Sequence, residues 1–161
     1  SLAQSLPITG AVVVCTPQEV ALLDASRAVS MFRQLRVPVL GMVENMAFFD
    51  VLAYLQDRGG PTARKLVEGK SCFDEPGDER VYLFGQGGAR RKAEAMNVPF
   101  LGEVPMNVFI REAGDVGRLE SALQEGSPSR PYLMGVVERL AAQVSIRNMK
   151  NVKMPKLEIL N

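Results

Sequence analysis

Residues 37–46 read VPVLGMVENM, and this stretch decides the fold. The apolar run 39–43 has no alternating polar positions, and it stops at Glu44 and Asn45. Such a run is typical of a parallel strand that is covered on both faces. Because ligands of open α/β sheets bind at the carboxyl ends of the strands, we expect this strand to deliver Asn45 to a binding edge. The Asn45 amide then either reads the edge of a nucleotide base or caps the strand–loop junction.

Two further apolar runs, residues 10–16 and 100–104, predict two more buried strands. Residues 18–35 have apolar side chains at helical spacing and predict a helix, with Thr16 as its N-cap and Pro17 in its first turn. The same pattern predicts helices in the ranges 89–96 and 131–144, with a short helical turn at 108–112 and a weak helical stretch at 119–126.

The order of elements indicates an α/β fold with parallel strands and helical crossovers. Three buried strands are fewer than an average sheet contains. We therefore expect one half of a larger doubly wound parallel sheet, with the other half missing from this chain or supplied by another. Residues 48–83 are rich in charge, Gly and Pro and predict a surface insertion. It begins with a short helix that ends at residues 59–60, and it closes with an edge strand at 81–84.

Charge and composition exclude several classes of partner. The chain has 161 residues with a formal net charge of +1, and 47% of them are hydrophobic. This balance predicts a soluble globular domain with no bulk affinity for nucleic acid or an anionic membrane. No apolar stretch reaches the roughly 20 residues of a membrane-spanning helix. The first ten residues, SLAQSLPITG, do not have the pattern of a secretory signal.

Few reactive side chains are present. The sequence contains no histidine and two cysteines, Cys15 in an apolar strand and Cys72 in a polar segment. The absence of histidine excludes Ser-His-Asp and Cys-His catalysis by these residues. There is no CxxC pair for a zinc or iron–sulfur site and no GxxxxGK[ST] phosphate loop. We therefore predict no catalytic residue and no metal ligand in this chain.

Two loops remain candidates for binding. Pro105, Met106 and Asn107 follow the last strand, where they form either a wall of the same pocket as Asn45 or an ordinary turn. The glycine-rich segment 85–88 precedes a helix and basic residues at 90–92, so it either cradles an anion or serves as a helix entry turn. The entry turn is the favoured interpretation. The polar segment 111–115 is either a solvated loop or a contact with a partner or the insertion.

Several blocks together resemble the Mrp/ApbC family of MinD-like P-loop ATPases. These are PITGAVVVCTPQEVALLDASRAVSMFRQLRVPVLGMVENM at residues 7–46 and FGQGGARRKAEAMNVPFLGEVPMNVFIREAGDVG at residues 84–117. The resemblance implies the C-terminal half of a doubly wound parallel-sheet P-loop NTPase fold. Residues 1–146 would be the partial domain, with an insertion at about 48–83, and residues 147–161 a basic tail.

The resemblance implies an ATP-binding, dimeric protein that assembles or transfers [4Fe-4S] clusters and acts on apo iron–sulfur client proteins. Asn45, Pro105, Met106 and Asn107 would form the adenine side of the pocket. ATP and magnesium would bind the full-length protein, and weakly or not at all this chain, because the phosphate loop and magnesium-binding aspartates of the family lie upstream of Ser1. The family implies an intracellular location, in an organelle or the cytoplasm.

The chain departs from the family pattern at two positions. Family members typically carry a CxxC soon after the ENM motif, whereas here AFFD follows and Cys72 stands alone in the insertion. This pattern is closer to the eukaryotic organellar branch. The family also usually has Asp where this chain has Asn107. Two alternative functions stay open: a non-catalytic module that docks client proteins, and a MinD-like spatial regulator.

Overall fold

Three parallel strands form the centre of the computed structural model, which describes residues 8–61 and 80–151. β2 (Val39–Asp50) lies between β1 (Ala11–Cys15) and β4 (Phe100–Met106), and it runs parallel to both. A short strand, β3 (Arg80–Val81), pairs antiparallel with the far end of β2. The predicted central strand and its two parallel neighbours are confirmed.

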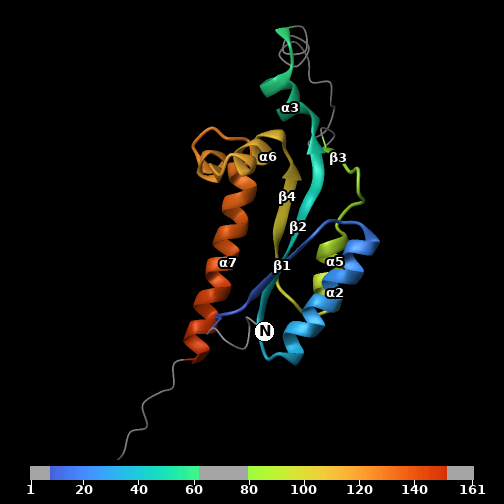
Figure 1. The fold of residues 1–161 in the computed structure, drawn as a ribbon, viewed down its shortest axis with the longest axis vertical. Helices are drawn as coiled ribbons and strands as arrows, with labels where there is room; N and C mark the ends of the chain where they lie inside the picture. The colour runs from blue at the N-terminus through green and yellow to red at the C-terminus, as the bar shows by residue number, and fades with distance from the viewer. Residues whose placement is uncertain (1–7, 62–79, 152–161) are drawn as a thin grey trace, which may run out of the picture.

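Helices cover both faces of this sheet (Figure 1). α2 (Glu19–Gln34) and α5 (Gly88–Ala95) pack on one face, while α7 (Arg130–Asn151) packs on the other. α3 (Val51–Arg58), α6 (Val108–Asp115) and the 3-10 helix η1 (Leu119–Leu123) lie toward the carboxyl ends of the strands. The sheet with its two helical layers is the α/β architecture that the sequence predicts.

The side chains of β2 alternate between the two faces of the sheet, and each face has its own hydrophobic core. Met42 is fully buried against α2 and α5, whereas Val43 faces the helix α7 side. Successive side chains of a strand point to opposite faces, so a run without polar positions is needed to fill both layers. By the same alternation Glu44 faces α5 and Asn45 faces the side of α7. This difference decides the roles of the two polar residues.

The two βα crossovers end in the same way. Arg36 after α2 and Asn97 after α5 both have positive φ, at 57° and 50°. The N–H of the following residue then donates to the carbonyl five residues earlier: Val37 donates to Phe32 and Val98 to Ala93, both at 2.9 Å. This is the Schellman arrangement of a helix C-terminus, and a proline then starts the path into the following strand.

Several predicted boundaries are wrong by a few residues. β2 continues through Phe48 to Asp50, so the first residues assigned to the insertion belong to the sheet. α2 begins at Glu19 with Gln18 as its N-cap, not at Thr16 and Pro17. β3 occupies Arg80–Val81, earlier than the predicted edge strand. α7 runs to Asn151 and takes in the start of the predicted tail.

Residues 62–79 and 152–161, which include Cys72 and the rest of the tail, lie outside the described residues. The division into a domain at 1–146 and a tail at 147–161 therefore stays a prediction.

Candidate functional site

Glu44 is the anion at the glycine-rich turn. Its side chain is 1% exposed, and its carboxylate accepts hydrogen bonds from the N–H groups of Gly87 at 3.2 Å and Ala89 at 2.6 Å. Gly87 is the N-cap of α5 and has φ of 65°. A helix N-terminus presents unpaired N–H groups and a partial positive charge, which favour a carboxylate. The favoured interpretation of 85–88 as an entry turn is therefore confirmed, and the alternative of an anion cradle for an external ligand is wrong because Glu44 occupies it.

The two arginines after this turn, Arg90 and Arg91, have internal contacts. Arg90 forms an ion pair with Glu103 and lies over the Phe100 ring at 4.4 Å, and Arg91 donates to the carbonyl of Gln86 at 2.8 Å. These contacts tie α5 to β4 and to its own entry turn.

Cys15 lies beside Glu44 in the parallel register of β1 and β2. Burial, and then the charge of Glu44, raise the pKa of the Cys15 thiol from 9.0 to about 11. A buried thiol with a raised pKa stays protonated and unreactive at neutral pH. The prediction that Cys15 is a buried packing residue is confirmed.

A bulge interrupts β2 directly after the predicted base-reading residue. The Oδ1 atom of Asn45 accepts a hydrogen bond from the N–H of Met46 at 3.0 Å, and Met46 has φ of 53°. The pairing with β4 moves from Asn45–Val104 to Phe49–Met106 across this irregularity. A bulge re-aims side chains at the end of a strand. The Asn45 side chain therefore uses its oxygen locally and keeps its two amide N–H donors for another partner.

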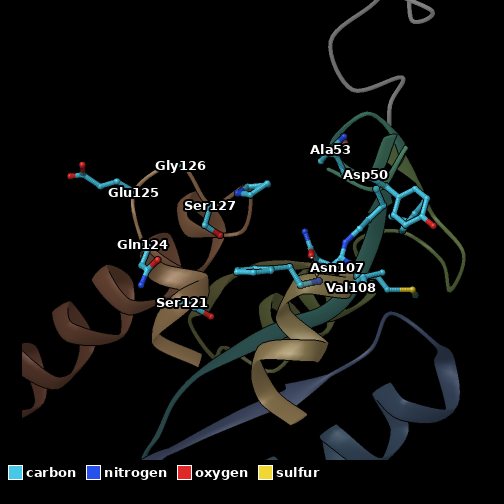
Figure 2. A pocket seen from close by; sticks show the side chains of 15 residues that line it. Asp50, Ala53, Asn107, Val108, Ser121, Gln124, Glu125, Gly126 and Ser127 are labelled. Atoms are coloured by element: carbon cyan, nitrogen blue, oxygen red, sulfur yellow. Dashed lines mark hydrogen bonds between the residues drawn. The ribbon is translucent and has the colours of Figure 1, made fainter. Parts of the chain in front are cut away.

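A cavity of about 220 Å³ lies where β2 and β4 end (Figure 2). The end of β2 and α3 form one wall, and the start of α6 forms another. The segment between η1 and α7 closes the rim. The lining residues are Phe49, Asp50, Ala53, Tyr54, Arg58, Met106, Asn107, Val108, Phe109, Ser121, Gln124, Glu125, Gly126, Ser127 and Pro128.

Met106 and Asn107 line this cavity, whereas Asn45 and Pro105 are not among its lining residues. Asn45 pairs in register with Val104, two residues before Met106. The Oδ1 atom of Asn107 accepts from the N–H of Phe109 at 2.7 Å and so caps α6. As in Asn45, the amide N–H groups of Asn107 remain for a partner.

The sequence did not reveal the opposite wall. Phe49, Asp50 and Tyr54 fall within the predicted insertion, yet they line the cavity together with Met106 and Asn107. Phe49 pairs in register with Met106 where β2 and β4 end. Asp50 caps α3 by accepting from the N–H of Ala53 at 2.8 Å. An Asp immediately before a run of helix formers is an N-cap signal, and Asp50 before residues 51–58 could have marked the end of the strand at this position.

The chemistry of the cavity suits a flat, partly polar ligand. Phe49, Tyr54 and Phe109 supply aromatic surface, and Met106 supplies a polarizable thioether. Amide and hydroxyl groups on the rim can bond the edge of a ring. Within the described ranges 8–61 and 80–151, no three His, Cys, Asp or Glu side chains are grouped to hold a metal ion.

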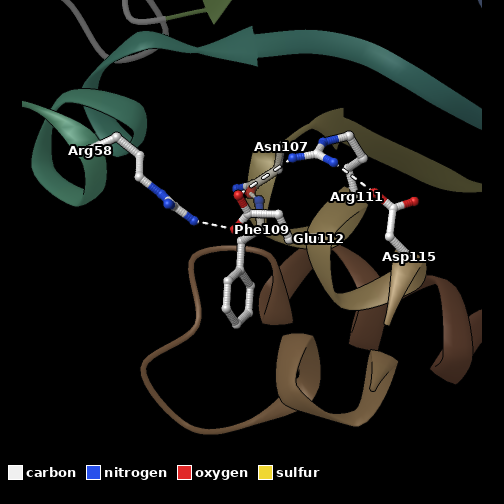
Figure 3. A network of polar contacts seen from close by, with 6 residues as sticks. All are labelled: Arg58, Asn107, Phe109, Arg111, Glu112 and Asp115. Carbon is white, nitrogen blue, oxygen red and sulfur yellow. Dashed lines mark hydrogen bonds and ion pairs between the residues drawn. The ribbon is translucent and has the colours of Figure 1, made fainter. Parts of the chain in front are cut away.

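An ion pair joins the two walls. Arg58 at the end of α3 pairs with Glu112 on α6, 54 residues further along the chain (Figure 3). On the outer side of α6, Arg111 pairs with Asp115 at 2.6 Å. The prediction left open whether the segment 111–115 contacts the insertion, and the Arg58–Glu112 pair shows that it does.

A parallel sheet with helices on both faces and a cavity at the carboxyl ends of its strands defines the α/β class whose ligands bind at that edge. A family model described as NUBPL iron-transfer P-loop NTPase (ParA) matches residues 1–56 and 63–141. The chain belongs to this family, as the resemblance to Mrp/ApbC proteins predicted.

The chain is 34% identical over 148 residues to the iron–sulfur cluster transfer protein NUBPL of Dictyostelium discoideum, covering 92% of this chain and 39% of that protein. It is 38% identical over 152 residues to the iron–sulfur cluster carrier protein of Deinococcus radiodurans, covering 94% of this chain and 36% of that protein. The chain thus spans less than two fifths of the length of these relatives.

A solved structure shares the fold. It is a nucleotide-binding protein from Archaeoglobus fulgidus in complex with ADP, with a TM-score of 0.50 and 32% identity. The match covers 74% of this chain and 41% of that one. Among the described residues of the chain, no helix is both long enough and apolar enough to cross a membrane.

Proposed function

We propose that this chain supplies the adenine-binding side of an ATP site in a protein that carries iron–sulfur clusters to apo client proteins. The cavity at the ends of β2 and β4 carries this proposal, because Met106 and Asn107 meet three aromatic side chains there. A volume of about 220 Å³ accommodates a purine ring with part of its sugar. The structural relative was solved in complex with ADP, which supports a nucleotide as the ligand. The two sequence relatives are named as iron–sulfur cluster transfer and carrier proteins, which supports an iron–sulfur cluster as the cargo.

In this proposal the amides of Asn107 and Asn45 donate to the ring nitrogens of adenine. Both side chains use Oδ1 for a local backbone bond, so each orients its NH₂ group as a donor. Pro105 is buried in β4 directly before Met106, the last residue of that strand, and Asn107 follows as the N-cap of α6. Asn45 does not line the cavity itself: it lies on β2 in register with Val104, two residues before Met106, and in this proposal its amide is the second donor to the base.

The phosphates and Mg²⁺ are held elsewhere in the proposed ATP site. The 161 residues contain no GxxxxGK[ST] motif, and phosphoryl transfer depends on the groups that hold the phosphates and the metal. In this proposal, ATP hydrolysis therefore requires the complete site, which includes the groups that hold the phosphates and Mg²⁺. We extend the proposal to a homodimer of the full-length protein that carries a [4Fe-4S] cluster inside the cell, in an organelle or the cytoplasm.

Isothermal titration of the chain with adenosine, ADP and guanosine tests this proposal. We expect weak binding of adenosine, binding of ADP that is no tighter, and weaker binding of guanosine. If the chain bound ADP much more tightly than adenosine, or hydrolysed ATP, this would contradict the proposal that the chain binds only the base and that the phosphates are held elsewhere. Equal affinity for guanosine would contradict recognition of adenine.

Two isosteric variants identify the donors. Asn107→Asp and Asn45→Asp each keep the oxygen that accepts the local backbone N–H and lose the amide donor. We expect both to weaken adenosine binding. A cavity that binds adenosine equally well in both variants would show that neither amide reads the base.

A further inference from the structure

The α3 helix is a wall of the cavity and is held at both ends. At its start, Asp50 caps it in direct continuation of β2. At its end, Arg58 pairs with Glu112 on α6, as Figure 3 shows. Ala53, Tyr54 and Arg58 line the cavity between these two points. The position of this wall is therefore set by a strand on one side and by an ion pair on the other.

The opposite wall is α6 itself. Val108 and Phe109 in its first turn line the cavity, and Glu112 follows one turn later on the same short helix. The ion pair thus bridges the two helices whose first turns enclose the cavity. A ligand that touches both walls favours the same arrangement of α3 and α6 as the ion pair does.

Tyr54 on α3 contributes aromatic surface to the cavity. Its ring lies 5.3 Å from the Phe49 ring at an interplanar angle of 53°, so the two form a tilted aromatic pair across the junction of β2 and α3. Tyr54 nevertheless remains 41% exposed. A planar base in the cavity covers aromatic surface that is otherwise open to solvent, and that burial stabilises α3 in place.

We infer that the Arg58–Glu112 pair positions α3 as the closing wall of this cavity, so that a bound base and the docked α3 helix stabilise one another. The inference rests on the proposed function, because it requires a base in the cavity. Coupling of this kind is reciprocal: a contact that improves base binding is itself strengthened by the base. Glu112 is then a positioning residue that does not itself line the cavity.

The size of the effect follows from the exposure of the pair. The side chains of Arg58 and Glu112 are 40% and 42% exposed. Ion pairs at such positions contribute at most about 1 kcal/mol, which corresponds to about a fivefold change in an equilibrium constant. The contribution also falls as salt screens the charges.

Glu112→Gln in the full chain tests the inference, with Asp115→Asn as its matched control. Both variants remove one negative charge from α6, but Asp115 pairs with Arg111 on the same helix and not with α3. Adenosine affinity is measured by titration at low salt and in 1 M NaCl. Hydrogen–deuterium exchange of the α3 backbone is measured with and without adenosine.

We expect Glu112→Gln to weaken adenosine binding about two- to fivefold at low salt, with a smaller difference at high salt, and Asp115→Asn to match the parent chain. Adenosine should slow exchange in α3 of the parent chain and of Asp115→Asn, and slow it less in Glu112→Gln. Adenosine binding that is unchanged by Glu112→Gln, with α3 exchange insensitive to the ligand, would overturn the inference and leave the proposed function standing. No adenosine binding by the parent chain would overturn both.

Discussion

The carboxylate of Glu44 accepts a hydrogen bond of 2.6 Å from the backbone N–H of Ala89, which lies 45 residues further along the chain. This bond joins the central strand to the first turn of α5 inside the protein. The same carboxylate also accepts from Gly87. The acidic residue before the predicted base-reading amide therefore has a structural role, as the fixed anion of a helix N-terminus.

Replacing Glu44 by Gln should destabilise the fold. The amide keeps one accepting oxygen but turns an NH₂ group toward a buried N–H donor, and the charge at the helix N-terminus is lost. A buried donor without a partner costs about 1–3 kcal/mol, so we expect a loss of about 2 kcal/mol in the free energy of unfolding. Urea unfolding followed by circular dichroism measures it. Glu94→Gln is the control, because Glu94 is exposed on the same helix, and it should change stability by less than about 0.5 kcal/mol.

The entry turn of α5 should tolerate no side chain at Gly88. A Cβ atom there would lie 2.7 Å from the Pro17 carbonyl oxygen and 2.7 Å from Leu22 Cδ1. The backbone oxygen cannot move without shifting the start of α2, so Gly88→Ala should cost about 1–3 kcal/mol through overpacking. Gly114→Ala in α6 is the counterpart, since nothing lies within 4 Å of the added atom. It should stabilise the chain by about 0.5–1 kcal/mol. Equal shifts of the thermal midpoint for the two variants would contradict this assignment.

Local pattern was enough to predict the sheet, and long-range packing explains most of what the sequence missed. The apolar runs around Val13, Met42 and Leu101 identify three strands because each must fill two layers. The far end of β2 was not predicted, because the bulge at Asn45 and Met46 hides the alternation of residues 47–50.

In the candidate site too, local sequence pattern predicted some residues, whereas others depend on long-range packing. Met106 and Asn107 were predicted as residues that follow a strand, and both line the cavity, although Met106 is the last residue of β4 and only Asn107 lies beyond it. Tyr54 and Arg58 were not, because their part in the cavity depends on α3 meeting α6 through a contact between residues 54 positions apart. No local pattern of residue types encodes such a contact. Glu44 and Asn45 both mark the end of the apolar run in the sequence, but the pleat sends their side chains to opposite faces, and the sequence did not predict the role of Glu44 at the start of α5.

The Cys15 thiol should resist alkylation until the chain unfolds. Its pKa is raised to about 11, so almost no thiolate exists at pH 8 in the folded state. The experiment uses a Cys72→Ser variant, so that Cys15 is the one remaining thiol. Iodoacetamide at pH 8 should leave it unmodified in buffer and modify it in urea, as read by mass spectrometry. Rapid modification in buffer would show that β1 opens to solvent in the folded chain.

The same shift makes stability depend on alkaline pH. The pKa of Cys15 is higher in the folded state than the ordinary value of 9.0, so the unfolded state releases its proton first as the pH rises. The free energy of unfolding should therefore fall between about pH 9 and pH 11. Cys15→Ala, which has no proton to lose, should show a smaller fall over this range, and an identical fall in both proteins would assign the pH dependence to other groups.

Two substitutions of Asn107 should separate its role as the N-cap of α6 from its proposed role in binding adenine. Its oxygen caps α6 through the N–H of Phe109, and loss of an N-cap costs about 1 kcal/mol. Asn107→Ala should therefore lower both stability and adenosine affinity. Asn107→Asp keeps the accepting oxygen and adds a negative charge that the helix N-terminus favours, so its stability should equal or exceed that of the parent chain while adenosine binding still weakens. If instead both variants lose stability equally and bind adenosine as the parent does, Asn107 holds the loop through contacts other than its cap and does not read the base.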